Sequence, residues 1–227
     1  MTITGISSMA TRAVLAELAA AYLQRTGHDV HIESVGGVDA AKRVQAGEVF
    51  DAVFLAADAI DKLIASGHAR AGSRVDLVRS AVAVAVREGA PRPHLGSEAA
   101  VKRAVQAAHS ISYSTGPSGV YLTRLFERWG IADEVRRRLV QAPPGVPVGS
   151  LVARGEVELG FQQLSELVHL DGITVLGTLP ADIAFITTFS GAVCATSAQP
   201  DAARDLLAFL AEPQAAAAKR RHGMEAA

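Results

Sequence analysis

The feature that most constrains the fold is a regular alternation of short apolar strands and amphipathic helices along the chain. Val14, Leu15 and Leu18 begin an apolar stripe at helical spacing, and Gly27 is placed to end that helix in a left-handed conformation. Residues 52–56 form an uninterrupted small-apolar run, which is typical of strands buried in parallel sheets. The alternation predicts an α/β fold with mainly parallel sheets flanked by helices.

Two similar stretches lie about 110 residues apart. Residues 46–49 (Ala-Gly-Glu-Val) lead into an apolar strand, a polar loop and a helix, and residues 154–157 (Arg-Gly-Glu-Val) lead into the same succession. Such self-similarity indicates two lobes of similar build, each with a polar loop at the end of a strand. We expect lobe I to comprise residues 1–80 plus 188–227 and lobe II residues 81–187, with two crossover strands, at residues 78–86 and 183–193, as the hinge.

Composition excludes several classes of function. The formal charge of −1, from 22 basic and 23 acidic side chains, lacks the basic field that nucleic-acid binding needs. Cys194 is the only cysteine, and the seven histidines show no metal-ligand spacing, so no metal site is predicted. Residues 114–119 (Ser-Thr-Gly-Pro-Ser-Gly) lack the lysine of a phosphate loop, and we expect no cofactor. Position 118 does not fit a nucleophile elbow either.

The N-terminus bears on localisation. It has neither a basic segment nor an apolar core, and no run of about 18 apolar residues follows. The sequence as written therefore predicts a cytoplasmic protein without membrane insertion. If an export signal has been removed, the expected location is the periplasm.

Four polar or glycine-containing loops follow predicted strands, where ligands of open α/β sheets bind. Helix starts at these points offer unpaired N–H groups and a positive dipole end, which favour anions. Each loop alone also reads as an ordinary helix cap or turn, but four at matching positions favour a shared anion site. The loops are residues 7–11, 35–38, 114–119 and 162–163.

Arginine side chains could neutralise a carboxylate ligand at such a site. Arg12 is predicted in the first turn of a helix, where a cation opposes the helix dipole, and a bidentate pair with a bound carboxylate would explain it. Arg79 stands near the start of the first predicted crossover strand. A solvated surface role is equally compatible with either residue.

Several short segments, in order and spacing over nearly the whole chain, resemble the periplasmic molybdate-binding proteins and the wider type II periplasmic solute-binding fold. The resemblance implies that the oxyanion is held by hydroxyl and backbone N–H groups of both lobes. It also implies closure of the lobes about a hinge on ligand binding. The segments are Ser-Ser-Met-Ala at 7–10, residues 40–47 running into Asp51 and 55–58, residues 117–121, and residues 151–156 running into Gly160-Phe161.

The sequence departs from that family at three positions. Pro147 has no N–H to donate, Gln163 stands where molybdate binders carry a tyrosine, and Arg12 is an added cation. A polycarboxylate or other organic anion is therefore as plausible a ligand as molybdate. The expected ligand-binding residues are Ser7, Ser8, Arg12, Gly37, Val38, Ser118, Gly119, Pro147 and Gln163, with Arg79 and Tyr121 as additional candidates.

We therefore expect a protein that binds a small oxyanion or organic polycarboxylate, partnered with an ABC transporter permease if exported. The alternative is a cofactor-free isomerase of an unsaturated polycarboxylate, because aconitate isomerase is similar to these solute-binding proteins. Such an enzyme needs an acid and a base. The four loops themselves contain no carboxylate, Asp39 and Asp58 are the carboxylates considered, and Asp58 is predicted as a helix cap, so no catalytic residue is assigned. A third reading is the effector-sensing domain of a transcription regulator.

Overall fold

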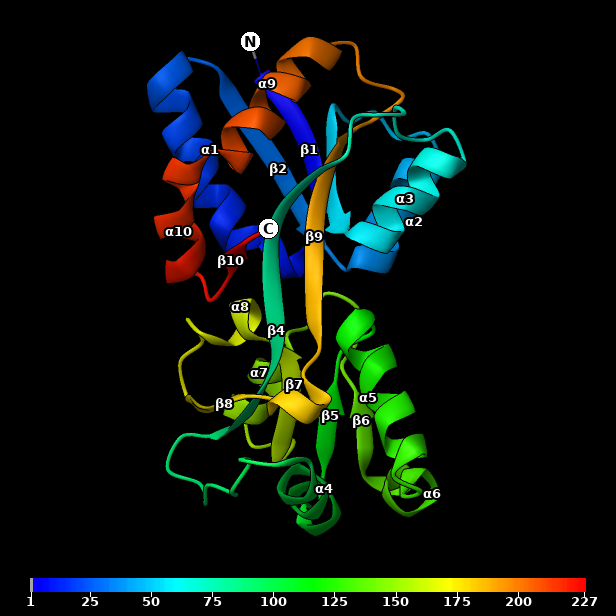
Figure 1. The fold of residues 1–227 in the computed structure, drawn as a ribbon, viewed down its shortest axis with the longest axis vertical. Coiled ribbons are helices and arrows are strands. Elements are labelled where there is room, and N and C mark those ends of the chain that lie inside the picture. The colour runs from blue at the N-terminus through cyan, green and yellow to red at the C-terminus, as the bar shows by residue number, and fades with distance from the viewer. Residues whose placement is uncertain (1) are drawn as a thin grey trace. The chain divides into compact units, whose positions relative to one another are not determined.

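The chain divides into two compact units in a computed structural model that describes residues 2–227 (Figure 1). Unit 1 contains residues 2–80 together with Thr187–Ala227, and unit 2 contains Ala81–Ile186. The chain passes from one unit to the other twice, within the strands β4 (Val75–Arg87) and β9 (Ile186–Val193). Both strands overlap the segments predicted as crossovers. Within residues 2–227, no helix is long and apolar enough to span a membrane.

Unit 1 is built on a mixed sheet in the order β2-β1-β3-β9-β4. Its first three strands pair in parallel, whereas β9 runs antiparallel to β3. A short C-terminal strand pairs antiparallel with β4. The strands are β1 (Thr2–Ser8), β2 (Asp29–Val35), β3 (Ala52–Ala56), β9, the first part of β4, and β10 (Glu225–Ala226).

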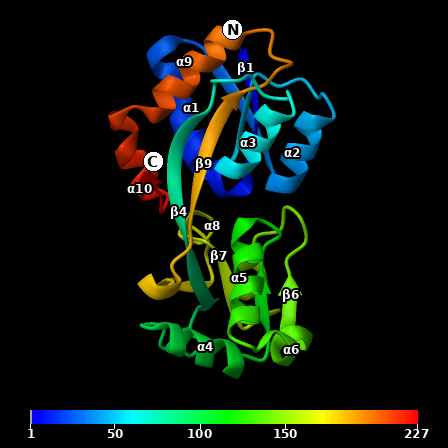
Figure 2. The same cartoon turned by 45° about the vertical axis from the view of Figure 1, so that its right-hand side comes forward.

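Helices cover both faces of this sheet, because alternate strand residues point to opposite faces. Phe54 belongs to the core with α1, α9 and α10, whereas its neighbours Val53 and Leu55 belong to the core with α2 and α3. Figures 1 and 2 show these helices on either side of the strands. The helices are α1 (Arg12–Thr26), α2 (Gly37–Gln45), α3 (Ala57–Ala65), α9 (Pro200–Ala211) and α10 (Ala216–Arg221), with 3₁₀ turns at Met9–Thr11 and Pro213–Ala215.

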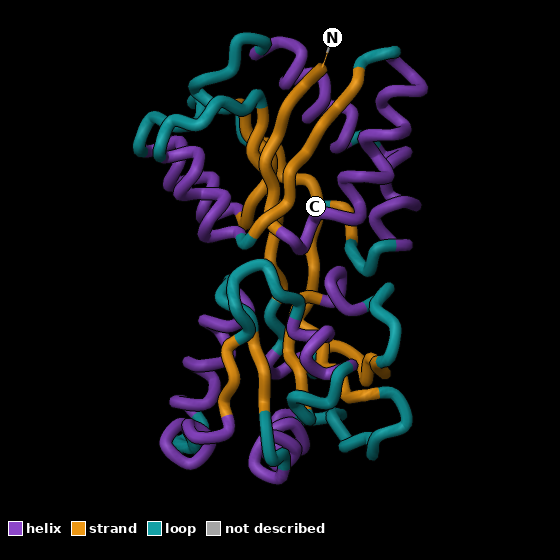
Figure 3. Tube along the Cα trace, turned by 180° about the vertical axis from the view of Figure 1, so that it is seen from behind, coloured by secondary structure: helices purple, strands orange, loops and turns teal. Residues whose placement is uncertain are grey.

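Unit 2 repeats the plan with the sheet order β4-β7-β5-β6, and β8 also pairs with β4. The pairs of β5 with β6 and with β7 are parallel, and β4 is antiparallel to β7. Figure 3 shows these strands from behind with helices beside them. The strands are β5 (Ile111–Tyr113), β6 (Leu139–Gln141), β7 (Leu159–Gln163) and β8 (Ile173–Thr178). The helices are α4 (Glu98–Ala107), α5 (Pro117–Arg128), α6 (Ala132–Val135), α7 (Val148–Ala153) and α8 (Leu164–Leu167), with 3₁₀ turns at Arg136–Arg138 and Ala181–Ile183.

The two similar sequence stretches are also similar in structure. Gly47 and Gly155 both adopt the left-handed conformation, with φ of 81° and 72°. Each glycine follows the end of a helix, where this conformation is common. A five-residue buried strand then runs directly into a helix in both places, as α2-β3-α3 and as α7-β7-α8. The predicted α/β fold is confirmed, with antiparallel pairs where β4 and β9 join otherwise parallel strands.

Two local predictions were wrong. Asp58 is not the cap of α3, because Ala56 occupies that position and Asp58 lies inside the first turn, paired with Lys62 at 3.6 Å. The second predicted crossover strand does not begin at Ile183, because residues 181–183 form a 3₁₀ turn and β9 begins at Ile186.

Candidate functional site

The carboxyl ends of three neighbouring strands meet at one edge of the sheet in unit 1. Ser7 is in register with Ser34 of β2 and with Phe54 of β3, and Ser8 is in register with Val35. Three helical segments therefore begin close together, namely the 3₁₀ turn before α1, then α2 and α3. The first residues of such helices have N–H groups without intrahelical partners, and no side chain caps any of the three.

Ser8 lies beside the start of α2. A Cβ atom built on Gly37 would lie 3.5 Å from the Ser8 Cβ atom, so the two residues are nearly in contact. The Ser8 hydroxyl is buried and has no hydrogen-bond partner within residues 2–227. Buried hydroxyls are normally satisfied, so an unpartnered donor beside an uncapped helix start is a feature that an anionic ligand would complete.

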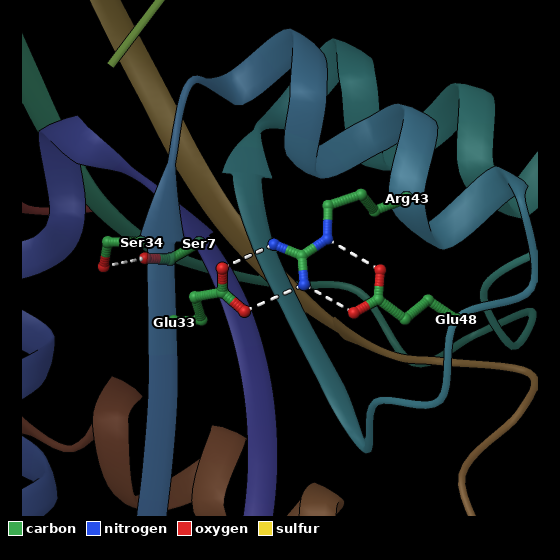
Figure 4. Close-up of polar contacts among 5 residues, drawn as sticks. All are labelled: Ser7, Glu33, Ser34, Arg43 and Glu48. Carbon is green, nitrogen blue, oxygen red and sulfur yellow. Dashed lines mark hydrogen bonds and ion pairs between the residues drawn. The ribbon is translucent and has the colours of Figure 1, made fainter. Parts of the chain in front are cut away.

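The other hydroxyls of this edge hold the loop in place. Ser7 Oγ lies 2.8 Å from Ser34 Oγ, between the neighbouring strands β1 and β2 (Figure 4). Ser7 Oγ also donates to the Ser8 carbonyl at 3.2 Å, and Thr11 Oγ1 donates to the same carbonyl at the same distance. Ser7 is therefore a supporting residue, and Ser8 is the hydroxyl left to interact with a ligand.

Two predicted residues of unit 1 are solvent-facing. Arg12 is exposed and lines an open groove of about 660 Å³ between α1 and β2, together with Ser34. Val38 is 48% exposed in the first turn of α2, so its N–H, and not its side chain, is the group suited to anion binding.

The Arg43 side chain of α2 is not available to a ligand. The Arg43 guanidinium makes a bidentate pair with Glu33 at 2.6 and 2.8 Å and reaches Glu48 at 2.5 and 2.7 Å (Figure 4). These hydrogen bonds raise the pKa of Arg43 and lower those of both glutamates. The Arg43 charge is thereby neutralised by two carboxylates and is not free to pair with an anion.

Unit 2 presents a second edge of the same kind, where β5 and β7 pair in parallel with Tyr113 in register with Phe161. The loop after β5 is folded tightly onto the first turn of α5. Ser114 Oγ lies 3.1 Å from Ser118 Oγ and accepts from the Gly116 N–H at 3.3 Å. A Cβ on Gly119 would lie 1.8 Å from the Ser114 carbonyl oxygen. Only glycine, which has no Cβ, fits this position. The start of α5 has no side-chain cap.

The end of β7 adds a chain of three polar groups. Pro147 is the N-cap of α7. Because proline has no N–H group, the N–H donors at this helix start belong to the residues that follow it. One of them, the Gly149 N–H, donates to Gln162 Oε1 at 3.2 Å. Gln162 Nε2 in turn donates to Glu166 Oε1 at 2.7 Å. Gln163, the next residue, is buried and is the N-cap of α8.

Glu166 is the carboxylate that sequence reasoning missed. Desolvation raises its pKa to about 7, against a smaller lowering effect of the hydrogen bond from Gln162. Glu166 as a whole residue is half-buried, and its hydrogen bond with Gln162 is part-buried. A carboxyl group that titrates near neutrality can both accept and return a proton.

The repeat could have revealed this pair. The N-caps of α3 and α8 are Ala56 and Gln163. The residue before the N-cap is Leu55 in unit 1 and Gln162 in unit 2. The third residue after the N-cap is Ala59 in unit 1 and Glu166 in unit 2. A polar pair thus replaces an apolar pair at equivalent positions of two similar units. Buried polar residues that break a local pattern are a recognised sign of function.

The two additional candidates, Arg79 and Tyr121, make contacts within the protein. Arg79 is exposed on β4, and its guanidinium donates to the Ala226 carbonyl at 3.0 and 3.3 Å. The Tyr121 hydroxyl donates to the Ile183 carbonyl at 2.9 Å, and its ring stacks on Phe185 with centroids 4.4 Å apart. Both side chains are thus occupied in structural contacts. Within residues 2–227, no group of three or more His, Cys, Asp or Glu side chains is arranged to hold a metal ion.

Known proteins resemble this chain over nearly its whole length. Aconitate isomerase from a Pseudomonas species is 41% identical over 230 residues, which are 99% of this chain and 87% of that protein. The molybdate-binding protein ModA of Azotobacter vinelandii is 28% identical over 219 residues, 93% of this chain and 84% of that protein.

Solved structures agree on the fold. The periplasmic molybdate-binding protein of Azotobacter vinelandii has a TM-score of 0.81 at 22% identity, covering 98% of both chains. The sulfate-binding protein SubI from Mycobacterium tuberculosis has a TM-score of 0.80 at 17% identity, covering 99% of this chain and 86% of that one. The family model described as bacterial extracellular solute-binding protein matches residues 3–225. The chain therefore belongs to the bacterial extracellular solute-binding protein family.

Proposed function

We propose that this protein binds a small polycarboxylate and isomerises aconitate. The observation that carries the proposal is the 41% identity to an aconitate isomerase over 99% of the chain. The site chemistry is compatible, because each unit offers uncapped helix starts and hydroxyls suited to carboxylate groups. The recessed carboxyl group of Glu166 further supports an enzyme over a simple carrier, since proton transfer needs a base that is partly protonated at neutral pH.

The reaction can be written as a balanced proton shift. Aconitate contains a vinyl carbon, a central carbon and a methylene carbon, each bearing a carboxylate. A base takes one methylene proton, the double bond moves to that side, and the proton is delivered to the former vinyl carbon. Nothing is oxidised or reduced. The negative charge that develops spreads onto the carboxylates, where N–H donors at helix starts would stabilise it.

A direct experiment is to incubate the purified protein with cis- or trans-aconitate and to follow interconversion by proton NMR. We expect both directions to reach the same equilibrium mixture. Ser8→Ala in unit 1 and Ser118→Ala in unit 2 should each weaken aconitate binding by roughly 10-fold or more, because a hydrogen bond to a charged group contributes about 1.5–3 kcal/mol. Absence of interconversion at high protein concentration would refute the proposal.

A second candidate is a binding protein that delivers an oxyanion or carboxylate to an ABC transporter in the periplasm. It is favoured by the family match and by the similarity to ModA. Calorimetry with molybdate, sulfate, phosphate, and di- and tricarboxylates separates the two candidates. Tight molybdate binding without aconitate turnover would support the carrier, and micromolar aconitate binding with turnover would support the enzyme. Closure of the units on the ligand stays a prediction, tested by a ligand-dependent decrease in radius of gyration.

A further inference from the structure

We propose that Glu166 is the residue that carries the proton in this isomerisation, and that Gln162 positions it. The inference rests on the proposed function, because it assigns the acid–base group of that reaction. It is drawn from three observations, namely the hydrogen-bond chain that holds the carboxyl group, the surroundings of that group, and its place in the repeat.

The hydrogen-bond chain fixes one carboxyl oxygen and leaves the other available. Glu166 Oε1 accepts from Gln162 Nε2 at 2.7 Å, and Gln162 is itself oriented by the Gly149 N–H, 3.2 Å from its Oε1. That second bond decides which end of the Gln162 amide faces Glu166, since the N–H occupies the amide oxygen. Within residues 2–227 no hydrogen bond is made to Glu166 Oε2. A base held through one oxygen can present the other to a substrate carbon.

No charged side chain on the surrounding elements pairs with Glu166. Helix α8 packs on β7, and its Leu167 packs against β4 and β8. Strands β7 and β8 carry no titratable residue, and the unit 2 part of β4 carries only Arg87, which lies beside Gly155. Desolvation and the Gln162 amide are accordingly the influences on this carboxyl group, and desolvation is the larger. His169, three residues further along the chain, is not among these influences, and a carboxyl group that no cation holds in the ionised form can gain and lose a proton during turnover.

The repeat indicates that this polar pair is not needed to build the unit. Unit 1 forms the same strand-to-helix junction with Leu55 and Ala59 at the positions of Gln162 and Glu166. An apolar pair would bury more favourably at this junction, because a desolvated carboxyl group lowers stability. A destabilising carboxyl group that is present at only one of the two equivalent strand-to-helix junctions suggests a function specific to unit 2.

In the proposed step, Glu166 as the carboxylate takes the methylene proton through one oxygen, and as the acid it gives the proton to the former vinyl carbon. The carboxyl group ends in its starting state, so the cycle needs no further acid or base. Gln162 does not touch the proton. Its amide favours the ionised form of Glu166 and limits rotation of the carboxyl group.

The test compares Glu166→Gln, Gln162→Met and the control Glu127→Gln with the wild type. Glu127 is a solvent-exposed glutamate on α5 in the same unit. Interconversion of aconitate and deuterium uptake from D₂O are followed by NMR, and aconitate affinity by calorimetry. We expect Glu166→Gln to lower kcat by at least about 100-fold. Its affinity for aconitate should stay equal or increase, because a negative charge near an anion is removed. Glu127→Gln should match the wild type.

The pH profile tests the positioning role. In the wild type, kcat/KM should rise with pH as the carboxyl group ionises, with an inflection near pH 7. Gln162→Met removes the hydrogen bond that favours ionisation, so the inflection should move to higher pH. A purely structural role would lower the rate without moving the inflection, and that result would overturn the assignment of Gln162.

The outcomes separate the inference from the proposed function. If the wild type interconverts aconitate and Glu166→Gln does so within 10-fold, the inference is wrong and the isomerase function stands. If Glu166→Gln loses binding together with turnover, Glu166 is a binding or structural residue, and the inference is again wrong. If the wild type shows neither interconversion nor deuterium uptake, both fail.

Discussion

Replacing Glu166 by glutamine should stabilise unit 2 in a pH-dependent way, independently of any ligand. The pKa of this carboxyl group is raised from 4.5 to about 7 by desolvation. Each pKa unit corresponds to about 1.4 kcal/mol, so ionised Glu166 lowers the free energy of unfolding by up to about 3 kcal/mol. Glutamine keeps the oxygen that accepts from Gln162 and carries no charge, so it avoids that cost.

The direction with pH follows from proton binding. Below pH 4.5 both folded and unfolded chains carry a protonated Glu166, so the wild type and Glu166→Gln should be about equally stable. Between pH 4.5 and 7 the folded chain retains the proton that the unfolded chain has lost, and the stability of the wild type falls as pH rises. Above pH 7 Glu166 is ionised in the folded chain as well, so the wild type has lost the full amount of stability. Glu166→Gln should then be more stable than the wild type by roughly 2–3 kcal/mol.

The single tryptophan makes the measurement specific to unit 2. Trp129 follows α5, donates through Nε1 to Glu98 at 2.6 Å and lies 6.0 Å from the Phe126 ring, so its fluorescence should report unfolding of this unit. Urea unfolding at pH 4.5 and pH 8 gives the two free energies. Glu127→Gln should stay within about 0.5 kcal/mol of the wild type at both values. Equal wild-type and Glu166→Gln stabilities at pH 8 would refute the reasoning.

Three further predictions address packing, capping and thiol chemistry. Gly119→Ala should destabilise unit 2 by more than about 1 kcal/mol in the Trp129 assay, because the new methyl group would overlap the Ser114 carbonyl oxygen; unchanged stability would contradict the tight loop. The Ser97 hydroxyl caps α4 by accepting a main-chain N–H at 3.2 Å. Ser97→Ala should therefore cost about 1 kcal/mol, and Ser97→Asp should restore the loss. Burial, with a smaller effect of Asp51, raises the pKa of the Cys194 thiol to about 12. This thiol should therefore react with a disulfide reagent at pH 8 only as unit 1 unfolds. A fast reaction in the native protein would contradict its burial.

The sequence predicted the main-chain plan well, because local patterns determine it. Apolar runs identified residues 52–56 as a strand, and helical spacing with a terminal glycine identified α1, which ends at Gly27 in the left-handed conformation. The short strands β6 and β8 were missed. Each gains its position from pairing with a strand distant in sequence, at β5 and β4, and three or six residues carry too weak a periodicity to signal that.

The site was predicted less completely than the fold. Loop positions followed from topology, so Ser8, Gly37 and Ser118 were found at uncapped or hydroxyl-rich helix starts. The hydrogen bonding and burial of individual side chains did not follow from the sequence. Only the three-dimensional contacts show that Tyr121 is held by a carbonyl group and that Glu166 is desolvated. Ile183 is 62 residues from Tyr121, and the desolvation of Glu166 depends on how α8 is packed, so residue spacing within one helix reports neither.

Comparison of the two units suggests how an anion-binding fold could acquire proton chemistry with few changes. Both units keep the strand-to-helix junctions and donor groups that suit carboxylates, and these need only main-chain geometry and small hydroxyls. Unit 1 retains an apolar pair at Leu55 and Ala59, whereas unit 2 has the polar pair Gln162 and Glu166. If the assignment holds, installing leucine and alanine at those two positions should leave anion binding in place while removing turnover. A double variant that still interconverted aconitate would show that the proton is carried elsewhere.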